Sequence, residues 1–166
     1  AIATASHTYA DHGVYVAKFT TTVSQPGGVK TRHFARVKVV NVPPHVEAGP
    51  PLVIDEGQEA EYVAAFTDPQ YPDTHQAVFD FGDDTLPVAG TITETNEPPQ
   101  AQGNATAKHA YCREGEYTVT IRVRDDDGGV GTDTQRVTVR NVPPTVDAGE
   151  DMFAYPCTPI TLTACF

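Results

Sequence analysis

The sequence is poor in several residue types, and each shortage excludes a class of protein. It has no Trp, 1 Met and 3 Cys among 166 residues, and its 11 Lys and Arg stand against 22 Asp and Glu, giving a formal net charge of −11. Binding to nucleic acid or to anionic membranes by charge requires clustered basic residues, so we expect neither partner. The acidic balance favours divalent cations, although it also serves simply to keep a surface protein soluble.

Long apolar runs, helical periodicity and catalytic motifs are missing as well. No apolar run approaches the about 20 residues that span a bilayer, so this segment is not expected to insert into a membrane. The 6 His are scattered, and the sequence contains no HExxH or GxSxG motif and no Gly-rich phosphate-binding loop. We therefore expect no enzymatic activity in this segment. With 14 Pro, 13 Gly and many Thr and Val, the composition favours an all-β protein.

A β-hairpin between residues 109 and 144 is the strongest structural signal. Its first strand alternates apolar with polar residues, as expected for a strand with one buried face, and the apolar set is Tyr117, Val119, Ile121 and Val123. The turn 125–129 reads DDDGG and contains the Gly residues that tight turns favour. Val137 and Val139 resume the alternation, and the prolines of 141–144 end it, because Pro donates no ladder hydrogen bond.

The same hairpin pattern occurs earlier in the chain. Residues 7–15 match residues 109–117 at an offset of 102, and residues 41–44 match 141–144 at an offset of 100. We therefore predict one complete repeat at 43–142, between a partial repeat at 1–42 and another at 143–166. A period near one hundred residues fits a string of independent domains rather than a solenoid.

Short alternating runs predict the remaining strands of the complete repeat. They are expected at 46–48 with 52–54 as one broken strand, at 60–66, at 77–81, and at 91–95 as the better part of 86–95. The polar stretches 67–74 and 96–103 are expected to be loops. About seven short strands with turns between them predict a two-sheet antiparallel β-sandwich.

Three separated motifs occur in order within this repeat. They are FDFGDD at residues 79–84, the set His109, Tyr111, Gly115 and Tyr117, and the set Val123, Asp125 and Gly128. Together they resemble the pattern of the PKD (polycystic kidney disease) repeat family, and the resemblance covers the whole central repeat. It implies tandem immunoglobulin-like β-sandwiches, one complete and two partial, in an extracellular or cell-surface protein.

Two positions depart from the family pattern. Phe79 replaces the usual Trp, which keeps a core role but removes an N–H donor. Asp84 replaces a turn Gly, which is tolerable because Asp visits the left-handed region more easily than most residues. The resemblance otherwise implies structural roles, in which Asp80 and Asp83 bond turn amides and the Tyr117 hydroxyl bonds the backbone.

The sandwich order predicts a cluster of acidic side chains at one pole. The loop 67–74 and the turn 125–129 are expected to lie together at the pole that receives the linker from the first repeat. The residues expected to converge there are Asp68, Asp73 and Asp125, and Asp126 or Asp127 is a further candidate ligand.

We expect calcium as the ligand of this cluster. Ca²⁺ takes about six to eight oxygen ligands, and the resemblance supports it, because PKD-like domains of secreted collagenases bind calcium with acidic residues of these loops. A cation here would stiffen the junction between repeats. The alternative is that these Asp residues only cap turns. A site in the first repeat is less expected, since Val23 stands at the position of Asp125.

Cysteine pairing and glycosylation give two further expectations. With 3 Cys, at most one disulfide forms within the segment, and Cys112 with Cys165 is the best pair because both are expected at the junction with the third repeat. Cys157 is expected too far from Cys165 along a turn and strand for the about 4.4–6.8 Å Cα spacing of a disulfide. Three free or externally paired thiols are the alternative. Asn104 begins an N-glycosylation sequon, a weak motif, on a stretch expected to be a polar loop.

Two functions remain open from the sequence. The first is a structural or adhesive spacer in a multi-repeat extracellular protein or fibre, contacting neighbouring repeats, other surface proteins or polysaccharide. The alternative is an accessory substrate-binding module of a secreted protease or glycosidase. The second function usually requires an exposed aromatic patch, whereas Tyr62 and Phe66 are expected to point inward, leaving Tyr71 as the main loop aromatic.

Self-assembly is a third idea, in which neighbouring chains complete the partial repeats by strand addition. Neither partial repeat contains an equivalent of residues 67–102, so two of them together still lack central strands. We therefore expect the remainder of these repeats in a longer parent protein.

Overall fold

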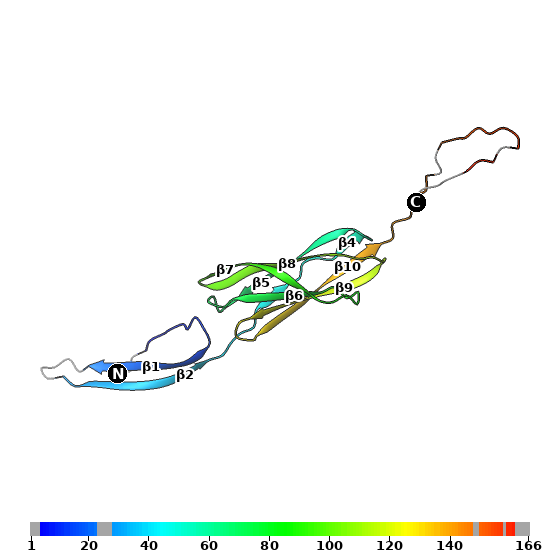
Figure 1. The fold of residues 1–166 in the computed structure, drawn as a ribbon. Helices are drawn as coiled ribbons and strands as arrows, with labels where there is room; N and C mark the ends of the chain where they lie inside the picture. The colour runs from blue at the N-terminus through cyan, green and yellow to red at the C-terminus, as the bar shows by residue number, and fades with distance from the viewer. Residues whose placement is uncertain (1–3, 23–27, 148–149, 158, 162–166) are drawn as a thin grey trace.

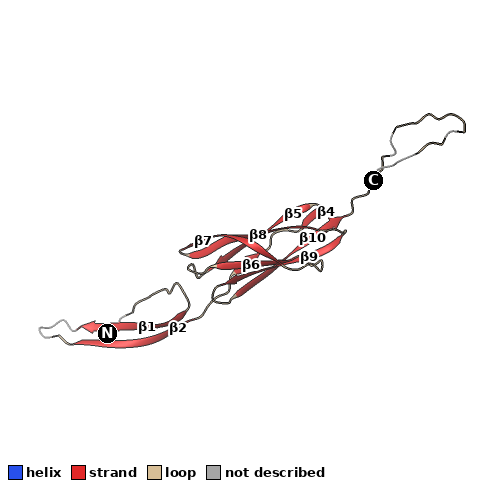
Figure 2. Cartoon of the chain, viewed as in Figure 1, coloured by secondary structure: helices blue, strands red, loops and turns tan. Residues whose placement is uncertain are grey.

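In the computed structural model, the chain is described at residues 4–22, 28–147, 150–157 and 159–161. This part is all-β and elongated, with a hairpin at one end and a β-sandwich in the middle (Figures 1 and 2). No helix in it is long and apolar enough to cross a membrane. Its strands are β1 (Gly13–Thr22), β2 (Lys30–Val39), β3 (His45–Glu47), β4 (Leu52–Asp55), β5 (Glu59–Asp68), β6 (His75–Asp80), β7 (Val88–Glu97), β8 (Gln100–Ala110), β9 (Gly115–Asp125) and β10 (Val130–Arg140).

The sandwich consists of two sheets that share one strand. The strand order runs β3-β5-β8-β7-β6-β9-β10-β4, and β7 turns from one sheet to the other because its first residues pair with β6 while residues 91–97 pair with β8. This arrangement corresponds to the ABED and CFG sheets of immunoglobulin-like folds. The broken first strand is confirmed, since β3 pairs antiparallel with β5 and β4 pairs parallel with β10.

The core lies between the two sheets and contains the predicted alternating residues. Tyr62, Phe79, Phe81, Val119, Ile121, Val123 and Val137 are each at most 1% exposed. Phe79, which occupies the Trp position of the family pattern, is fully buried. The buried Tyr111 hydroxyl donates to the Phe81 carbonyl at 2.9 Å, so this polar atom of the core is satisfied.

The turn after β6 confirms the structural roles expected for its Asp residues. The Gly82 amide donates to Asp80 Oδ1 at 3.2 Å, and the Thr85 amide donates to Asp83 Oδ1 at 3.2 Å. Asp84 has a φ of 66°, in the left-handed region that the usual Gly of this position adopts freely.

The prediction of a loop at 96–103 is wrong. Residues up to Glu97 belong to β7 and those from Gln100 belong to β8, and the two strands pair antiparallel around Pro98 and Pro99. The alternation that would have predicted a strand here was weak, because β8 buries only small side chains, Ala101, Ala105 and Ala107. The prolines, which suggested a break, occupy the turn itself, where no ladder hydrogen bond is needed.

The β1–β2 hairpin repeats the pairing of β9 with β10. Gly13 faces Val39 and Tyr15 faces Val37 in the first hairpin, as Gly115 faces Val139 and Tyr117 faces Val137 in the second. The division into one complete and two partial repeats at 1–42, 43–142 and 143–166 stays a prediction. The described residues of 142–161 contain one bridge residue, Asp147, and no strand, and most of the strand predicted through Phe166 lies outside the described residues.

Candidate metal site at the linker pole

The predicted proximity of the two acidic loops is confirmed. The loop between β5 and β6 and the turn between β9 and β10 lie at the same end of the sandwich, where the Thr74 amide donates to Asp126 Oδ1 at 3.1 Å. Asp125 closes the turn, since its amide donates to the Gly129 carbonyl and its Oδ1 accepts the Gly129 amide at 2.6 Å. This end is called the linker pole below.

Three of the predicted metal ligands converge at the linker pole. Asp68 at the end of β5, Asp73 in the loop and Asp125 at the end of β9 each offer a carboxylate oxygen, and these oxygens lie within 4.8 Å of one another. The three residues are 0%, 3% and 2% exposed. Such close burial of like charges is unfavourable unless a proton or a cation compensates it.

Hydrogen bonds account for two of the three carboxylates. Asp68 Oδ1 accepts the Gln70 amide at 2.7 Å, and Asp125 Oδ2 accepts the Asn41 side-chain amide at 3.0 Å. Asp73 Oδ2 is buried without a hydrogen-bond partner among the described residues. Turn capping therefore explains Asp68 and Asp125 but leaves one oxygen of Asp73 unexplained.

Lys and Arg do not balance this charge in the described residues. Their ion pairs lie elsewhere, between Lys108 and Glu59 and between Arg140 and Asp55. The imidazole of His75 is within reach of the cluster, with Nε2 at 3.4 Å from Asp68 Oδ2, but its Nδ1 is 2.7 Å from Glu94 Oε2.

The electrostatics of Asp73 follow from this environment. Burial, together with the charges of Asp68, Asp127, Asp126 and Asp11, raises the pKa of Asp73 to about 7. Protons thus compete with a cation for this site near neutral pH, and a bound cation would hold the carboxylate in its charged form.

Asp127 does not join this group of three. It lies instead with Asp11 and His12, from the segment before β1, in a second group whose ligand atoms are within 4.8 Å of one another. The reason is the direction of the turn, which brings Asp125 inward and leaves the Asp127 side chain 18% exposed at the surface facing His12. The sequence analysis missed Asp11 and His12, because the equivalent positions of the other repeat are Arg113 and Glu114.

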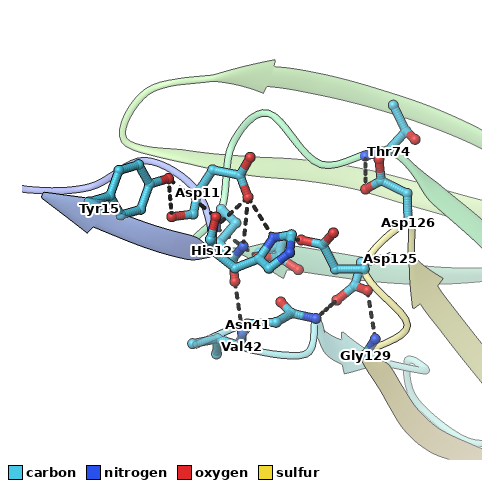
Figure 3. Close-up of polar contacts among 12 residues, drawn as sticks. Asp11, His12, Tyr15, Asn41, Val42, Thr74, Asp125, Asp126 and Gly129 are labelled. Atoms are coloured by element: carbon cyan, nitrogen blue, oxygen red, sulfur yellow. Dashed lines mark hydrogen bonds and ion pairs between the residues drawn. The ribbon is translucent and has the colours of Figure 1, made fainter. Parts of the chain in front are cut away.

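Two further residues missed by the sequence analysis connect the linker to the pole. Asn41 donates to Asp125, and Gln70 accepts the Val42 amide at 2.7 Å through Oε1 while its Nε2 lies 3.4 Å from Asp11 Oδ1. Figure 3 shows Asp11 and His12 beside the turn that carries Asp125 and Asp126. Only the recurrence of Asn41 as Asn141 in the second linker could have drawn attention to it.

The other predicted site residues lie apart from the linker pole. Cys112 is exposed and has no disulfide partner among the described residues, and Cys165 lies outside them, so their pairing stays a prediction. Asn104 is exposed on β8, a central strand, and not in a loop as expected. The sequon therefore belongs to a sheet surface, and its glycosylation stays a prediction.

Comparison with known proteins identifies the family. The family model described as "PKD domain" matches residues 41–139, which is more than half of the chain, and the chain therefore belongs to the PKD domain family. No curated protein matches the chain.

Solved structures similar to the chain include the BIgI domain of beta protein from S. agalactiae bound to CEACAM1. The likeness covers 60% of this chain and 97% of that one, at 19% identity and a TM-score of 0.35. A structure of titin kinase and its flanking domains is also similar over 66% of this chain, at 20% identity and a TM-score of 0.37, and the match spans 19% of the titin chain.

Proposed function

We propose that this chain is a non-catalytic structural or adhesive segment of a multi-repeat extracellular protein, whose linker pole binds calcium through Asp68, Asp73 and Asp125. The observation that carries the proposal is the buried Oδ2 of Asp73, which has no partner in the described part of the chain, beside two other buried carboxylates. Calcium supplies the positive charge that would compensate these three carboxylates.

The donor set fits calcium better than a softer metal. All three side chains offer carboxylate oxygens, and Ca²⁺ completes its shell of about six to eight oxygens with carbonyls and water. A surface pocket of about 320 Å³ opens beside Asp125 and offers a cation an approach from solvent. The residues that line this pocket are Thr74, His75, Gln76, Arg124, Asp125 and Asp126.

Calcium at this position would support a spacer function. Asp125 accepts a hydrogen bond from the Asn41 side chain. Gln70, in the same loop as Asp73, accepts one from the Val42 amide. The cation would thus fix both loops against the linker, which contains Pro43 and Pro44 and is stiff for that reason. Calcium binding would reduce bending at this junction and so make the string of domains straighter.

The surface of the sandwich favours the spacer over the accessory module of a hydrolase. Within residues 45–140, the large hydrophobic side chains that are exposed are all aliphatic: Val53, Val63, Val78, Leu86, Val88 and Val130. Binding to a polymer usually uses exposed aromatic rings, which bury much area at little entropic cost. Contacts with proteins or polysaccharide through other parts of the parent protein remain part of the proposal.

Calorimetric titration with Ca²⁺ tests the proposal on the full chain after treatment with EDTA. We expect one Ca²⁺ per chain and a melting temperature that rises with calcium. Both effects should disappear in Asp73→Asn and Asp125→Asn. Asp84→Asn is the matched control, because it removes a carboxylate from the turn after β6 and Asn also tolerates the left-handed region. Absence of binding, or equal binding in Asp73→Asn, would contradict the proposal.

A further inference from the structure

The second group at the linker pole combines an imidazole with two carboxylates. His12 Nδ1 lies 2.9 Å from Asp11 Oδ1 and 2.5 Å from Asp127 Oδ2. Asp11 and His12 belong to the segment before β1, whereas Asp127 belongs to the turn between β9 and β10. The group therefore joins the hairpin to the sandwich across the linker.

One ring nitrogen cannot satisfy two carboxylates through ordinary hydrogen bonding. Nδ1 carries either one hydrogen or one lone pair, and its hydrogen bond goes to Asp11 Oδ1, which also accepts the His12 amide at 2.6 Å. Asp127 Oδ2 nevertheless approaches the same nitrogen from the other side of the junction. The two oxygens approach the nitrogen itself, as in an ion pair, and a divalent cation placed between these three atoms, which lie within 4.8 Å of one another, would use all of them as ligands.

A second observation, independent of this geometry, is the excess of negative charge. Asp73 is 3% exposed, its Oδ2 has no partner among the described residues, the charge of Asp11 acts on it, and its own charge acts on His12. With Asp68, Asp125 and Asp126, the pole combines six carboxylates with the imidazoles of His12 and His75. A cation at the calcium site offsets only part of this charge.

We propose that Asp11, His12 and Asp127 form a second metal site, which takes a borderline divalent cation such as Zn²⁺ and thereby links the hairpin to the sandwich. An imidazole nitrogen with two carboxylates suits Zn²⁺ or Co²⁺, whereas Ca²⁺ prefers an all-oxygen shell. The proposed site shares no ligand with the calcium site, although the charge of Asp73 bears on both.

The exposure of the group is compatible with metal entry. The Asp11 and His12 side chains are 46% exposed, so the metal has an open path and water can fill the remaining positions. Bonds of about 2.0–2.2 Å from zinc to nitrogen or oxygen place the ligand atoms of a tetrahedron roughly 3.3–3.6 Å apart. The three atoms must therefore separate by about 1 Å, a movement that half-exposed side chains allow.

Titration with Zn²⁺ in excess Ca²⁺ tests this site on the full chain. Thiols also bind zinc, so the parent for this test carries Cys112→Ser, Cys157→Ser and Cys165→Ser. We expect one Zn²⁺ per chain and at least a tenfold loss of affinity in His12→Gln and in Asp127→Asn. His45→Gln is the matched control, because His45 is also exposed and lies 3.6 Å from a single carboxylate, that of Glu47.

Two further readings complete the test. Co²⁺ in place of Zn²⁺ should give visible absorption bands that depend on His12, and melting curves of the variants without zinc should match the parent. If the group is only an ion pair, the parent will not bind zinc. If zinc binds at other residues, His12→Gln will bind it with the same affinity as the parent. Either result would overturn the proposal, whatever the calcium titration shows.

Discussion

The two hairpins of this chain have the same local structure in different surroundings. In β1–β2 the Tyr15 hydroxyl donates to the Asp11 carbonyl at 3.0 Å, and in β9–β10 the Tyr117 hydroxyl donates to the Arg113 carbonyl at 3.0 Å. The ring of Tyr9 stacks on Tyr15 as Tyr111 stacks on Tyr117, at 4.4 and 4.1 Å between centroids. Local sequence therefore builds the hairpin and its tyrosine corner without a second sheet.

Burial separates the two copies. Phe19 on β1 is 50% exposed, whereas its equivalent on β9, Ile121, is fully buried. The difference arises because β9 and β10 face the β5 and β8 sheet, and no such sheet faces β1 and β2 in the described residues. The same side-chain pattern thus contributes much to stability in one copy and little in the other.

The largest expected contrast is between Ile121→Ala and Phe19→Ala. Ile121→Ala removes core packing and leaves a cavity, and should lower the free energy of unfolding of the sandwich by about 2–5 kcal/mol. Phe19→Ala should change it by less than about 1 kcal/mol, because the side chain is half exposed. Urea unfolding followed by circular dichroism measures both. Equal losses would show that β1–β2 has a covering that the described residues do not contain.

A smaller contrast is expected for the tyrosines of the repeated motif. Tyr111→Phe leaves the buried Phe81 carbonyl without its donor and should cost about 1–3 kcal/mol. Tyr9→Phe, at the equivalent position, should be close to neutral. The measurement is the urea concentration at the midpoint of unfolding, compared between variants whose unfolding free energy depends on urea with the same slope. A near-neutral Tyr111→Phe would mean that water replaces the lost donor.

Asp73, in the loop between β5 and β6, should give the sandwich a pH dependence of its own. The pKa of Asp73 rises from 3.8 in the unfolded chain to about 7 in the folded one, so the folded state binds its proton more tightly. Stability of the metal-free protein should therefore fall as pH rises from about 4 to 7. Asp73→Asn should flatten this slope when melting is measured in EDTA. An unchanged slope would indicate that Asp73 is well solvated.

The smallest expected effect concerns Asp83, which bonds His109 at 2.8 Å. Burial acts to raise the pKa of Asp83, but hydrogen bonds from Thr85 and His109 outweigh it and hold the pKa below 3.8. Asp83 thus contributes stability above that pH, which is lost as pH falls through the folded pKa. Asp83→Asn should cost roughly 0.5–1 kcal/mol at neutral pH, and this cost should shrink as pH falls through the folded pKa. His7→Gln, whose imidazole bonds no carboxylate among the described residues, is the control, and a loss that does not shrink as pH falls would contradict this assignment.

The sequence allowed most of the sandwich to be predicted, with clear limits. Strands with large alternating residues, such as Tyr62 and Phe66 of β5, were recognisable because burial of these side chains dominates folding. Strand β8 was not, since its inward residues are alanines that provide little hydrophobic signal. The three buried Asp residues were predicted because strand order alone brings the ends of β5 and β9 to one pole.

What the sequence determined by itself is local: the alternation of strands, the tyrosine corners, the acidic turn and the repeat that relates the two hairpins. Each depends on residues close together in the chain. Tertiary structure decided which hairpin is buried, that Asp127 faces His12 while Asp125 turns inward, and that Gln70 holds the linker. These contacts join residues far apart in sequence, such as Asn41 and Asp125, and their geometry depends on how two sheets and a linker pack in space.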